Sequence, residues 1–234
     1  MKSILLIGMG KFGQLLGKQL LKLKNEVVIV DKNEEIINRL ASSYASAKIM
    51  NALNTESLQM MDIPSYDSCV VAIGDDFQSS LEVTSLLKEL GAKHVVSRAT
   101  TQIQRKFLLR NGADEVIYPD LDIAEKVAIT LTEHVHDYIE IDPKYSVMEI
   151  DSPTAWVGKS IAELNIRKKY NLNILAVRIG EETIGDLTPE YVFPSKVHLL
   201  VLGKQPTFSN SQEKGYARKI ATPWWLFLRK EVQT

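Results

Sequence analysis

Cysteine is almost absent from this sequence, since Cys69 is the only one among 234 residues. A single thiol excludes an internal disulfide framework and a cysteine-rich zinc ribbon. No apolar run approaches the roughly 20 residues that a membrane-spanning helix needs. The N-terminal apolar run ends in glycines and lacks the small-residue cleavage site of a signal peptide. We therefore expect a globular protein of the cytoplasm.

An excess of either charge is also lacking. The chain has 28 Lys and Arg residues against 29 Asp and Glu residues, for a formal net charge of -1. A nucleic-acid-binding domain is usually basic, so we expect no nucleic-acid partner. The exception is a basic and aromatic C-terminal tail at residues 204–234, which has six basic residues, two acidic residues and an apolar block at 224–228.

Apolar residues make up 45% of the chain, which is enough for one large core and a small second one. Up to about residue 135, short apolar runs alternate with amphipathic stretches, a pattern typical of βαβ units in a parallel sheet. The pattern predicts strands at 3–7, 27–30, 47–50, 68–73, 94–97 and 115–118, and helices at 11–23, after the cap Asn33, and at 55–61, 77–90, 101–110 and 123–136.

Beyond about residue 138 the pattern changes to short alternating strands separated by turns that contain Gly and Pro. These strands are predicted at 145–150, 173–179, 182–184 and 196–202. The fold class that follows is α/β, with a doubly wound, Rossmann-type parallel sheet and a small α+β lobe. We assign the N-lobe to residues 1–137 and the second lobe to residues 138–203, before the tail at 204–234.

Three glycines, Gly8, Gly10 and Gly13, follow the first predicted strand and open the first predicted helix. In that context G-x-G-x-x-G predicts a turn that binds a nucleotide pyrophosphate. Gly8 permits the tight turn, Gly10 lets the backbone approach the phosphates, and Gly13 lets the helix pack closely. Asp31 ends the second predicted strand, where a carboxylate can accept both ribose hydroxyls and repel a 2′-phosphate.

Further candidates lie at the ends of the other predicted strands, because open parallel sheets bind their ligands there. Arg98 is a candidate partner for a phosphate, and Asp120 for a cation that accompanies a phosphate. Taken singly, these strand-end residues are equally well explained as turn and capping residues. The predicted nucleotide-binding set comprises Gly8, Met9, Gly10, Lys11, Phe12, Gly13, Asp31, Lys32, Asn51, Ala52, Ile73, Gly74, Asp75 and Arg98.

Groups that would support catalysis are missing. A dehydrogenase needs a proton donor and a substrate pocket beside its nicotinamide, and no candidate for either is found. Cys69 and His198 lie inside predicted strands, and we interpret both as structural. His134 and His136 lack the i, i+4 spacing of a helical zinc-binding pair and any nearby acid-rich ligand set, so no zinc site is predicted. The sequence predicts a site that binds a nucleotide without transforming it.

Several short segments carry a pattern that extends beyond the glycine turn: 7–14, 30–31, 51–52, 70–74, 112–114, 157–161, 174–177 and 200–203. Through these segments, over about residues 1–203, the sequence resembles the RCK family of regulators of potassium conductance. The resemblance is to the stand-alone subunits of Ktr/Trk-type bacterial potassium transport systems, which combine a TrkA-N with a TrkA-C domain. That family often has arginine where this chain has Lys11. Lysine keeps the positive charge but lacks the guanidinium group that can bind a phosphate through two hydrogen bonds.

The resemblance implies a cytosolic regulatory subunit, peripheral on the plasma membrane, that is not an enzyme. Dimers would assemble into an octameric ring on a membrane potassium-translocating subunit, and exchange of ATP for ADP, or of NADH for NAD, would change the shape of the ring. A single pair of lobes favours the ATP/ADP form. The resemblance further implies a cation site at Asp120 and a cyclic-dinucleotide site at Ile174 and Leu175.

Two alternatives remain open on the sequence. One is a small NAD-dependent oxidoreductase with an atypical second domain. The other is the same regulatory module acting on a different cation transporter or an antiporter. The role of the tail is open as well, because its apolar block at 224–228 suits a membrane interface, a channel partner, packing on its own dimer or a disordered end.

Overall fold

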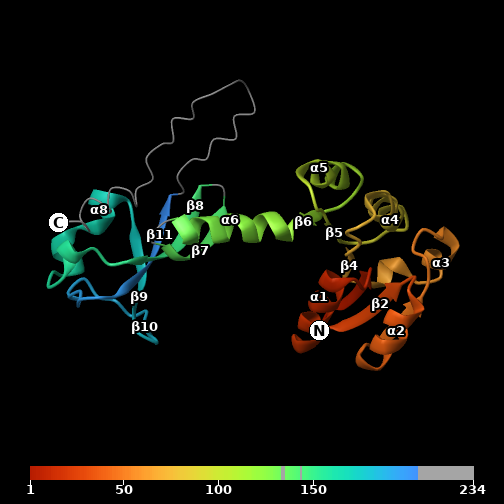
Figure 1. The fold of residues 1–234 in the computed structure, drawn as a ribbon, viewed down its shortest axis with the longest axis horizontal. Coiled ribbons are helices and arrows are strands. Elements are labelled where there is room, and N and C mark those ends of the chain that lie inside the picture. The colour runs from red at the N-terminus through yellow and green to blue at the C-terminus, as the bar shows by residue number, and fades with distance from the viewer. Residues whose placement is uncertain (133–134, 143, 205–234) are drawn as a thin grey trace, which may run out of the picture. The chain divides into compact units, whose positions relative to one another are not determined.

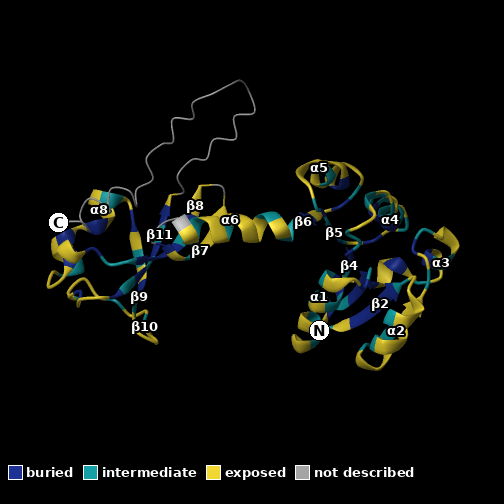
Figure 2. Cartoon of the chain, viewed as in Figure 1, coloured by how far each residue is buried: buried dark blue, intermediate teal, exposed yellow. Residues whose placement is uncertain are grey.

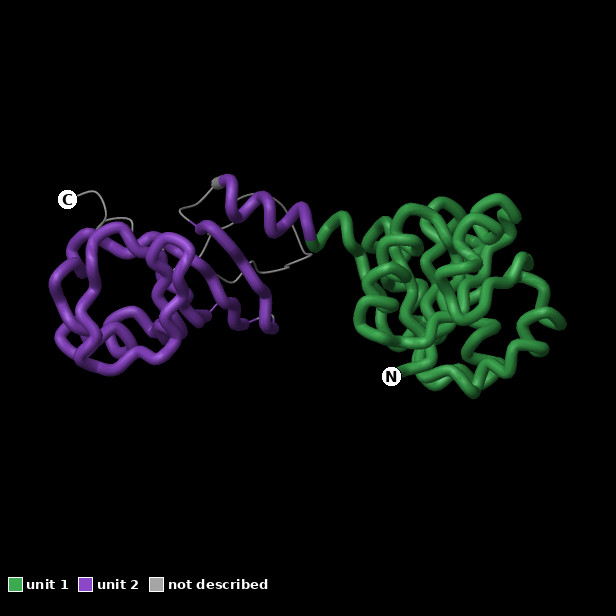
Figure 3. Tube along the Cα trace, turned by 90° about the horizontal axis from the view of Figure 1, so that it is seen from below, with its two compact units in different colours: residues 1–122 green, residues 123–234 purple. Residues whose placement is uncertain are grey.

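The structure is a computed structural model that describes residues 1–132, 135–142 and 144–204 (Figure 1). The chain divides into two compact units, Met1–Asp122 and a second unit that begins at Ile123 (Figure 3). This division falls earlier than the boundary at 137/138 that the sequence predicts. Helix α6 (Pro119–Thr132) contributes Ile129 to the core of the second unit, and its Lys126 Nζ lies 2.7 Å from Asp137 Oδ1 of that unit.

The first unit is built on a six-stranded parallel sheet in the order β3-β2-β1-β4-β5-β6. This order confirms the predicted doubly wound, Rossmann-type fold. Strands β2 and β3 are added on one side of β1 and strands β4 to β6 on the other, so the strand order reverses between β1 and β4. The strands are β1 (Ser3–Ile7), β2 (Glu26–Asp31), β3 (Ser46–Ile49), β4 (Ser68–Val71), β5 (Val95–Arg98) and β6 (Glu115–Ile117).

Alternate residues of the central strands pack into two separate cores. Leu5 and Ile7 of β1 belong to one apolar cluster, whereas Ile4 and Leu6 belong to another. Side chains alternate between the two faces of a strand, so the sheet is covered on both faces, as its nearly unbroken apolar runs predict (Figure 2). Cys69 of β4 is fully buried, and desolvation raises the pKa of its thiol to about 12, which fits a core residue.

The connecting helices begin at side-chain caps, with one exception. Asn33, Asn54, Asp76 and Thr101 each accept a hydrogen bond from the backbone N–H three residues further on. Gly10, at the start of the first helix, makes no such side-chain bond. The helices are α1 (Lys11–Lys22), α2 (Glu34–Leu40), α3 (Thr55–Gln59), α4 (Phe77–Glu89) and α5 (Gln102–Arg110), with single 3-10 turns at Ala41–Ser43 and Ile63–Ser65.

The second unit holds a five-stranded antiparallel sheet in the order β10-β9-β11-β8-β7, which confirms the predicted α+β lobe. Its core is formed around the fully buried Trp156 and Phe193. The elements are β7 (Val135–Asp142), β8 (Tyr145–Asp151), a 3-10 turn (Thr154–Trp156), α7 (Ile161–Leu164), α8 (Ile166–Tyr170), β9 (Asn173–Ile179), β10 (Glu182–Ile184) and β11 (His198–Lys204).

Strand β7 is the strand that the sequence prediction missed. The predicted helix 123–136 ends at Thr132, and Val135 and His136 already belong to the strand. Pairing with β8 explains why these residues form a strand, because β7 and β8 make an antiparallel hairpin. Asp142 holds the turn of this hairpin by accepting the backbone N–H of Lys144.

None of the helices within the described ranges combines the length and apolar character that a bilayer span requires.

Candidate functional site

A cavity of about 370 Å³ lies at the carboxyl ends of strands β1, β2 and β4. This is where the strand order of the parallel sheet reverses, the position at which such sheets bind their ligands. The predicted site residues that line this cavity are Gly8, Gly10, Asp31, Lys32, Asn51, Ala52, Ile73, Gly74 and Asp75. The local glycine motif and the separate strand ends therefore meet around one space.

The three glycines of the turn have different surroundings. Gly8 has a φ of +95°, and a Cβ there would lie 3.1 Å from the backbone of Ala72 and Ile73. A Cβ on Gly13 would lie 2.0 Å from the carbonyl oxygen of Gly8, whereas a Cβ on Gly10 would meet nothing within 4 Å. Gly8 and Gly13 are thus required by the turn itself, and Gly10 borders open space in the cavity.

Asp31 holds the glycine turn in place from the end of β2. Its Oδ2 accepts the backbone N–H of Met9 at 2.6 Å, and its Oδ1 accepts the N–H of Asn33 at 2.8 Å. The Met9 side chain is fully buried and does not line the cavity, so this residue contributes to the site through its backbone. Each carboxylate oxygen can accept more than one hydrogen bond, so Asp31 can also accept hydroxyls of a ligand.

The first turn of α1 offers a positive end to the cavity. Gly10 is its N-cap, without a side-chain cap bond and without an acidic residue in the first turn. The N–H groups of such a turn lack intrahelical partners and attract anions. Lys11 is exposed at this end of the helix and adds a positive charge, although it does not line the cavity.

Arg98 extends from the end of β5 toward the same turn. Its guanidinium lies 5.4 Å from the ring centre of Phe12, and a Cβ on Gly74 would lie 2.5 Å from its Nη1. Its Nε is buried and has no hydrogen-bond partner among the described residues. Asp120, in the first turn of α6, has its Oδ2 3.8 Å from Arg98 Nη2 and is largely exposed. A cation at Asp120 would therefore have a guanidinium beside it.

The cavity also has a wall that sequence reasoning missed. Asp76 and Ser79 line it from the start of α4, and Asn33 lines it from the start of α2. Hydrogen bonds from the hydroxyl and the backbone N–H of Ser79 lower the pKa of the Asp76 carboxyl. Their signal in the sequence is that of helix caps, and a cap gives no indication that it also faces a cavity. Apolar residues complete the wall: Ile7, Val30, Ile36, Met50, Leu53, Ala72 and Val83.

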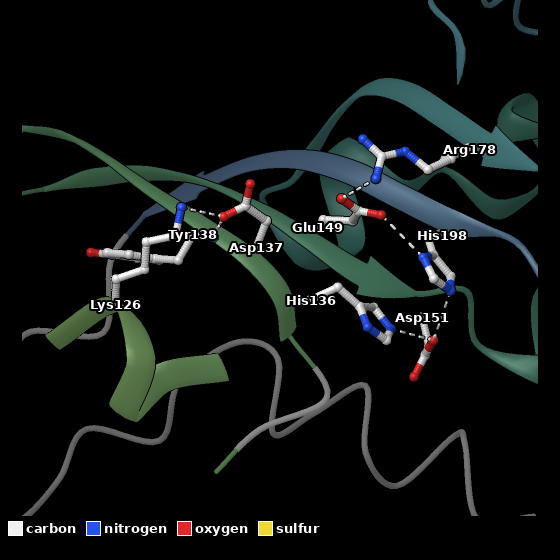
Figure 4. Close-up of polar contacts among 8 residues, drawn as sticks. All are labelled: Lys126, His136, Asp137, Tyr138, Glu149, Asp151, Arg178 and His198. Carbon is white, nitrogen blue, oxygen red and sulfur yellow. Dashed lines mark hydrogen bonds and ion pairs between the residues drawn. The ribbon is translucent and has the colours of Figure 1, made fainter. Parts of the chain in front are cut away.

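In the second lobe, Ile174 and Leu175 are consecutive residues of β9 and point to opposite faces of the sheet. Ile174 packs against the core of the lobe, whereas Leu175 is 42% exposed. The sequence indicates no acid-rich ligand set near His136, whereas the structure places its Nε2 2.8 Å from Asp151 Oδ1 (Figure 4). His134 and the apolar block at 224–228 lie outside the described residues.

Known proteins with both lobes are similar to this chain. The model of the TrkA-N domain matches residues 4–119, and that of the TrkA-C domain matches residues 146–209. The Ktr system potassium uptake protein A of Bacillus subtilis is 33% identical over 215 residues, which cover 92% of this chain and 97% of that protein. The Ktr system potassium uptake protein C of the same organism is 30% identical over 214 residues, which cover 91% and 97%.

A solved structure repeats the fold over nearly the whole chain. The GsuK channel bound to NAD aligns with a TM-score of 0.62 over 93% of this chain and 40% of that one. The sequence identity is 16%, so this likeness concerns the fold alone. The present chain spans less than half of the length of that channel protein.

Proposed function

Because this chain belongs to the family of the Ktr system potassium uptake proteins A and C, with a TrkA-N and a TrkA-C domain, we propose that it is a nucleotide-sensing regulatory subunit of a membrane potassium transporter or channel. The observation that carries the proposal is the cavity formed by the glycine turn, Asp31 and the open first turn of α1. The names of the relatives favour potassium over another cation.

The residues of the cavity fit an adenine nucleotide. Asp31 would accept the ribose hydroxyls, and the N–H groups at the start of α1 would hold phosphate oxygens. Gly10 leaves the space for them, and Arg98 has a buried Nε without a partner among the residues described. Arg98 and Lys11 would neutralise the phosphates. We favour ATP and ADP as the ligands. NAD or NADH is the second choice, and it is included because the similar GsuK channel binds NAD.

Two further ligands belong to the same proposal. Asp120 offers one exposed carboxylate, so a cation there would need phosphate oxygens as its other ligands. A cyclic dinucleotide in the second lobe would contact Leu175 on the exposed face of β9. Ile174 would act by packing, because it faces the core of the lobe.

Regulation without turnover agrees with the wall of the cavity. The described residues that line it include no His, Tyr or Cys. Hydrogen bonds from Ser79 lower the pKa of the Asp76 carboxyl, which keeps it ionised and unsuited to donate a proton at neutral pH. Because the similar Ktr proteins are components of potassium uptake systems, we propose that the chain binds its nucleotide without catalysing a reaction.

Self-assembly would turn nucleotide binding into a mechanical signal. Helix α6 exposes Ile123, Val127 and Leu131, which are spaced four residues apart and so share one face. A second copy of the chain would cover this face, and dimers would form a ring, octameric by the family resemblance, on the cytosolic side of the membrane subunit. A nucleotide shifts such an assembly only by its different affinities for the two shapes.

Isothermal titration calorimetry with ATP, ADP, NAD and NADH tests the site on the full chain. Gly10→Asp introduces a negative charge where the phosphates would lie, and its Cβ has open space around it. Gly185→Asp is the matched control, since a Cβ at this exposed glycine of the second unit also meets nothing within 4 Å. We expect Gly10→Asp to weaken binding at least tenfold and Gly185→Asp to leave it unchanged. Equal binding by a folded Gly10→Asp protein would refute the assignment.

A further inference from the structure

Three strands of the second unit bring together side chains that lie far apart in the sequence. His136 comes from β7, Asp151 from β8 and His198 from β11 (Figure 4). His198 stands directly opposite Asp151 in the β11–β8 register. His136 lies where the β7–β8 register shifts between Val135 and Asp137, and such a bulge re-aims the side chain of its extra residue.

The ligand atoms of these side chains lie close together. Asp151 Oδ1 lies 2.8 Å from His136 Nε2 and 3.6 Å from His198 Nε2. One ligand atom from each of the three residues lies within 4.8 Å of the others. In a tetrahedral zinc site with bonds of about 2.0 Å, the ligand atoms are about 3.3 Å apart, which lies between the two measured distances.

Rotation of both imidazole rings separates the observed arrangement from a coordinating one. The two imidazole rings are stacked, with centres 4.1 Å apart and planes 4° from parallel, so they would have to tilt to point both Nε2 atoms at one ion. Their side chains are 43% and 38% exposed, and therefore have room to tilt.

A second carboxylate orients one of the histidines. Glu149 is nearly buried, and its Oε1 lies 3.0 Å from His198 Nδ1, while Arg178 Nη1 lies 2.9 Å from its other oxygen. With Nδ1–H donated to Glu149, the lone pair of His198 is on Nε2 and faces Asp151. This carboxylate–histidine pair is the usual support of a metal-binding imidazole. Arg178 balances the charge of Glu149.

We propose that His136 Nε2, Asp151 and His198 Nε2 bind a divalent transition-metal ion, with a water molecule as the fourth ligand. Two imidazole nitrogens and one carboxylate oxygen suit Zn²⁺, whereas Mg²⁺ and Ca²⁺ prefer oxygen ligands throughout. The ion would join the edge strand β7 to β8 and to β11. This site is separate from the nucleotide cavity and does not depend on the proposed function.

Titration of the metal-free full chain with Zn²⁺, followed by calorimetry, and with Co²⁺, followed by its visible absorption, tests the proposal. We expect one ion per chain and a tetrahedral Co²⁺ spectrum. His136→Ala and His198→Ala should each weaken Zn²⁺ binding at least tenfold. His94→Ala, a change of the same type in the first unit, should not. All variants are compared after circular dichroism has shown that they are folded.

Glu149→Gln provides a second variant, in which all three ligands remain. The loss of the carboxylate that orients His198 should weaken Zn²⁺ binding about 10- to 100-fold. A merely adventitious contact of Zn²⁺ with surface histidines would not respond to this change. No saturable binding by the wild-type chain, or equal binding by the wild type and the His136→Ala/His198→Ala double variant, would overturn the proposal and leave a hydrogen-bonded cluster without a metal.

Discussion

At the scale of single residues, the same substitution, glycine to alanine, is expected to have different effects at Gly13 and at Gly10. A Cβ on Gly13 would lie 2.0 Å from the Gly8 carbonyl oxygen, and backbone cannot move aside as a flexible side chain can. We expect Gly13→Ala to displace the start of α1, to cost about 1–3 kcal/mol in the free energy of unfolding, and to abolish nucleotide binding.

Gly10→Ala is the matched control, because its Cβ meets nothing within 4 Å and its φ of -66° suits any residue. Its cost should stay within about 1 kcal/mol, the size of a weaker helix cap. Urea denaturation of both variants checks the contrast. Equal unfolding midpoints for the two would contradict the close approach of Gly13 to Gly8.

Single residues also show how far a sequence can predict a site. The glycine turn and Asp31 were predictable because their pattern is local and each residue type has a backbone or charge reason. The cluster of His136, Asp151 and His198 was not, because it depends on strand order and on one bulge. Asp76 was missed for a related reason, since a helix cap does not reveal that it borders a cavity.

At the scale of elements, Asp114 links α4 to the edge of the parallel sheet. Its carboxylate lies 2.8 Å from Lys88 Nζ of α4 and accepts the backbone N–H of Val95 of β5 at 2.7 Å. Burial raises the pKa of this carboxyl, but the hydrogen bonds from Lys88 and Val95 and the charge of Lys88 outweigh it, so the pKa is lowered.

The folded protein therefore holds the Asp114 proton more weakly than the unfolded chain does. The stabilising contribution is complete above the unfolded pKa of about 3.9 and is lost as the pH falls through the lower folded pKa. We expect Asp114→Asn to be less stable than the wild type at neutral pH, with a difference that shrinks in acid. Urea unfolding at several pH values measures it, and a difference that does not depend on pH would contradict this account.

The secondary structure shows the same limit of local reasoning. Strands β1 to β6 were predicted from their apolar runs, because both faces of the sheet are buried and each run is distinct. The sequence pattern places the first two residues of β7 at the end of a helix and does not predict the rest of the strand, because it forms by pairing with β8, which cannot be read from residues 135–142 alone. The boundary between the units lies before Ile123 and not at 137/138 for the same reason, because α6 packs on the core that this hairpin helps to form.

At the scale of the whole molecule, the apolar face of α6 predicts self-association. Ile123, Val127 and Leu131 are 61%, 44% and 80% exposed, which is unfavourable for a chain that remains a monomer. Leu131→Asp should shift the dimer toward the monomer in sedimentation experiments, without a change in circular dichroism. The control is Glu125→Lys, a charge change at an exposed residue of the same helix. Lys126 is not suitable as a control position, because its side chain pairs with Asp137. A monomeric wild type would contradict the prediction.

On the proposed function, nucleotide bound at the glycine turn controls potassium movement through a membrane partner. Potassium flux into vesicles that hold a Ktr-type membrane subunit, with the full chain added, tests it most directly. We expect the flux to differ between ATP and ADP with the wild-type chain and with Gly185→Asp, and we expect Gly10→Asp to abolish this difference. The same flux with either nucleotide, or an ATP-dependent response that persists in a folded Gly10→Asp protein, would contradict it.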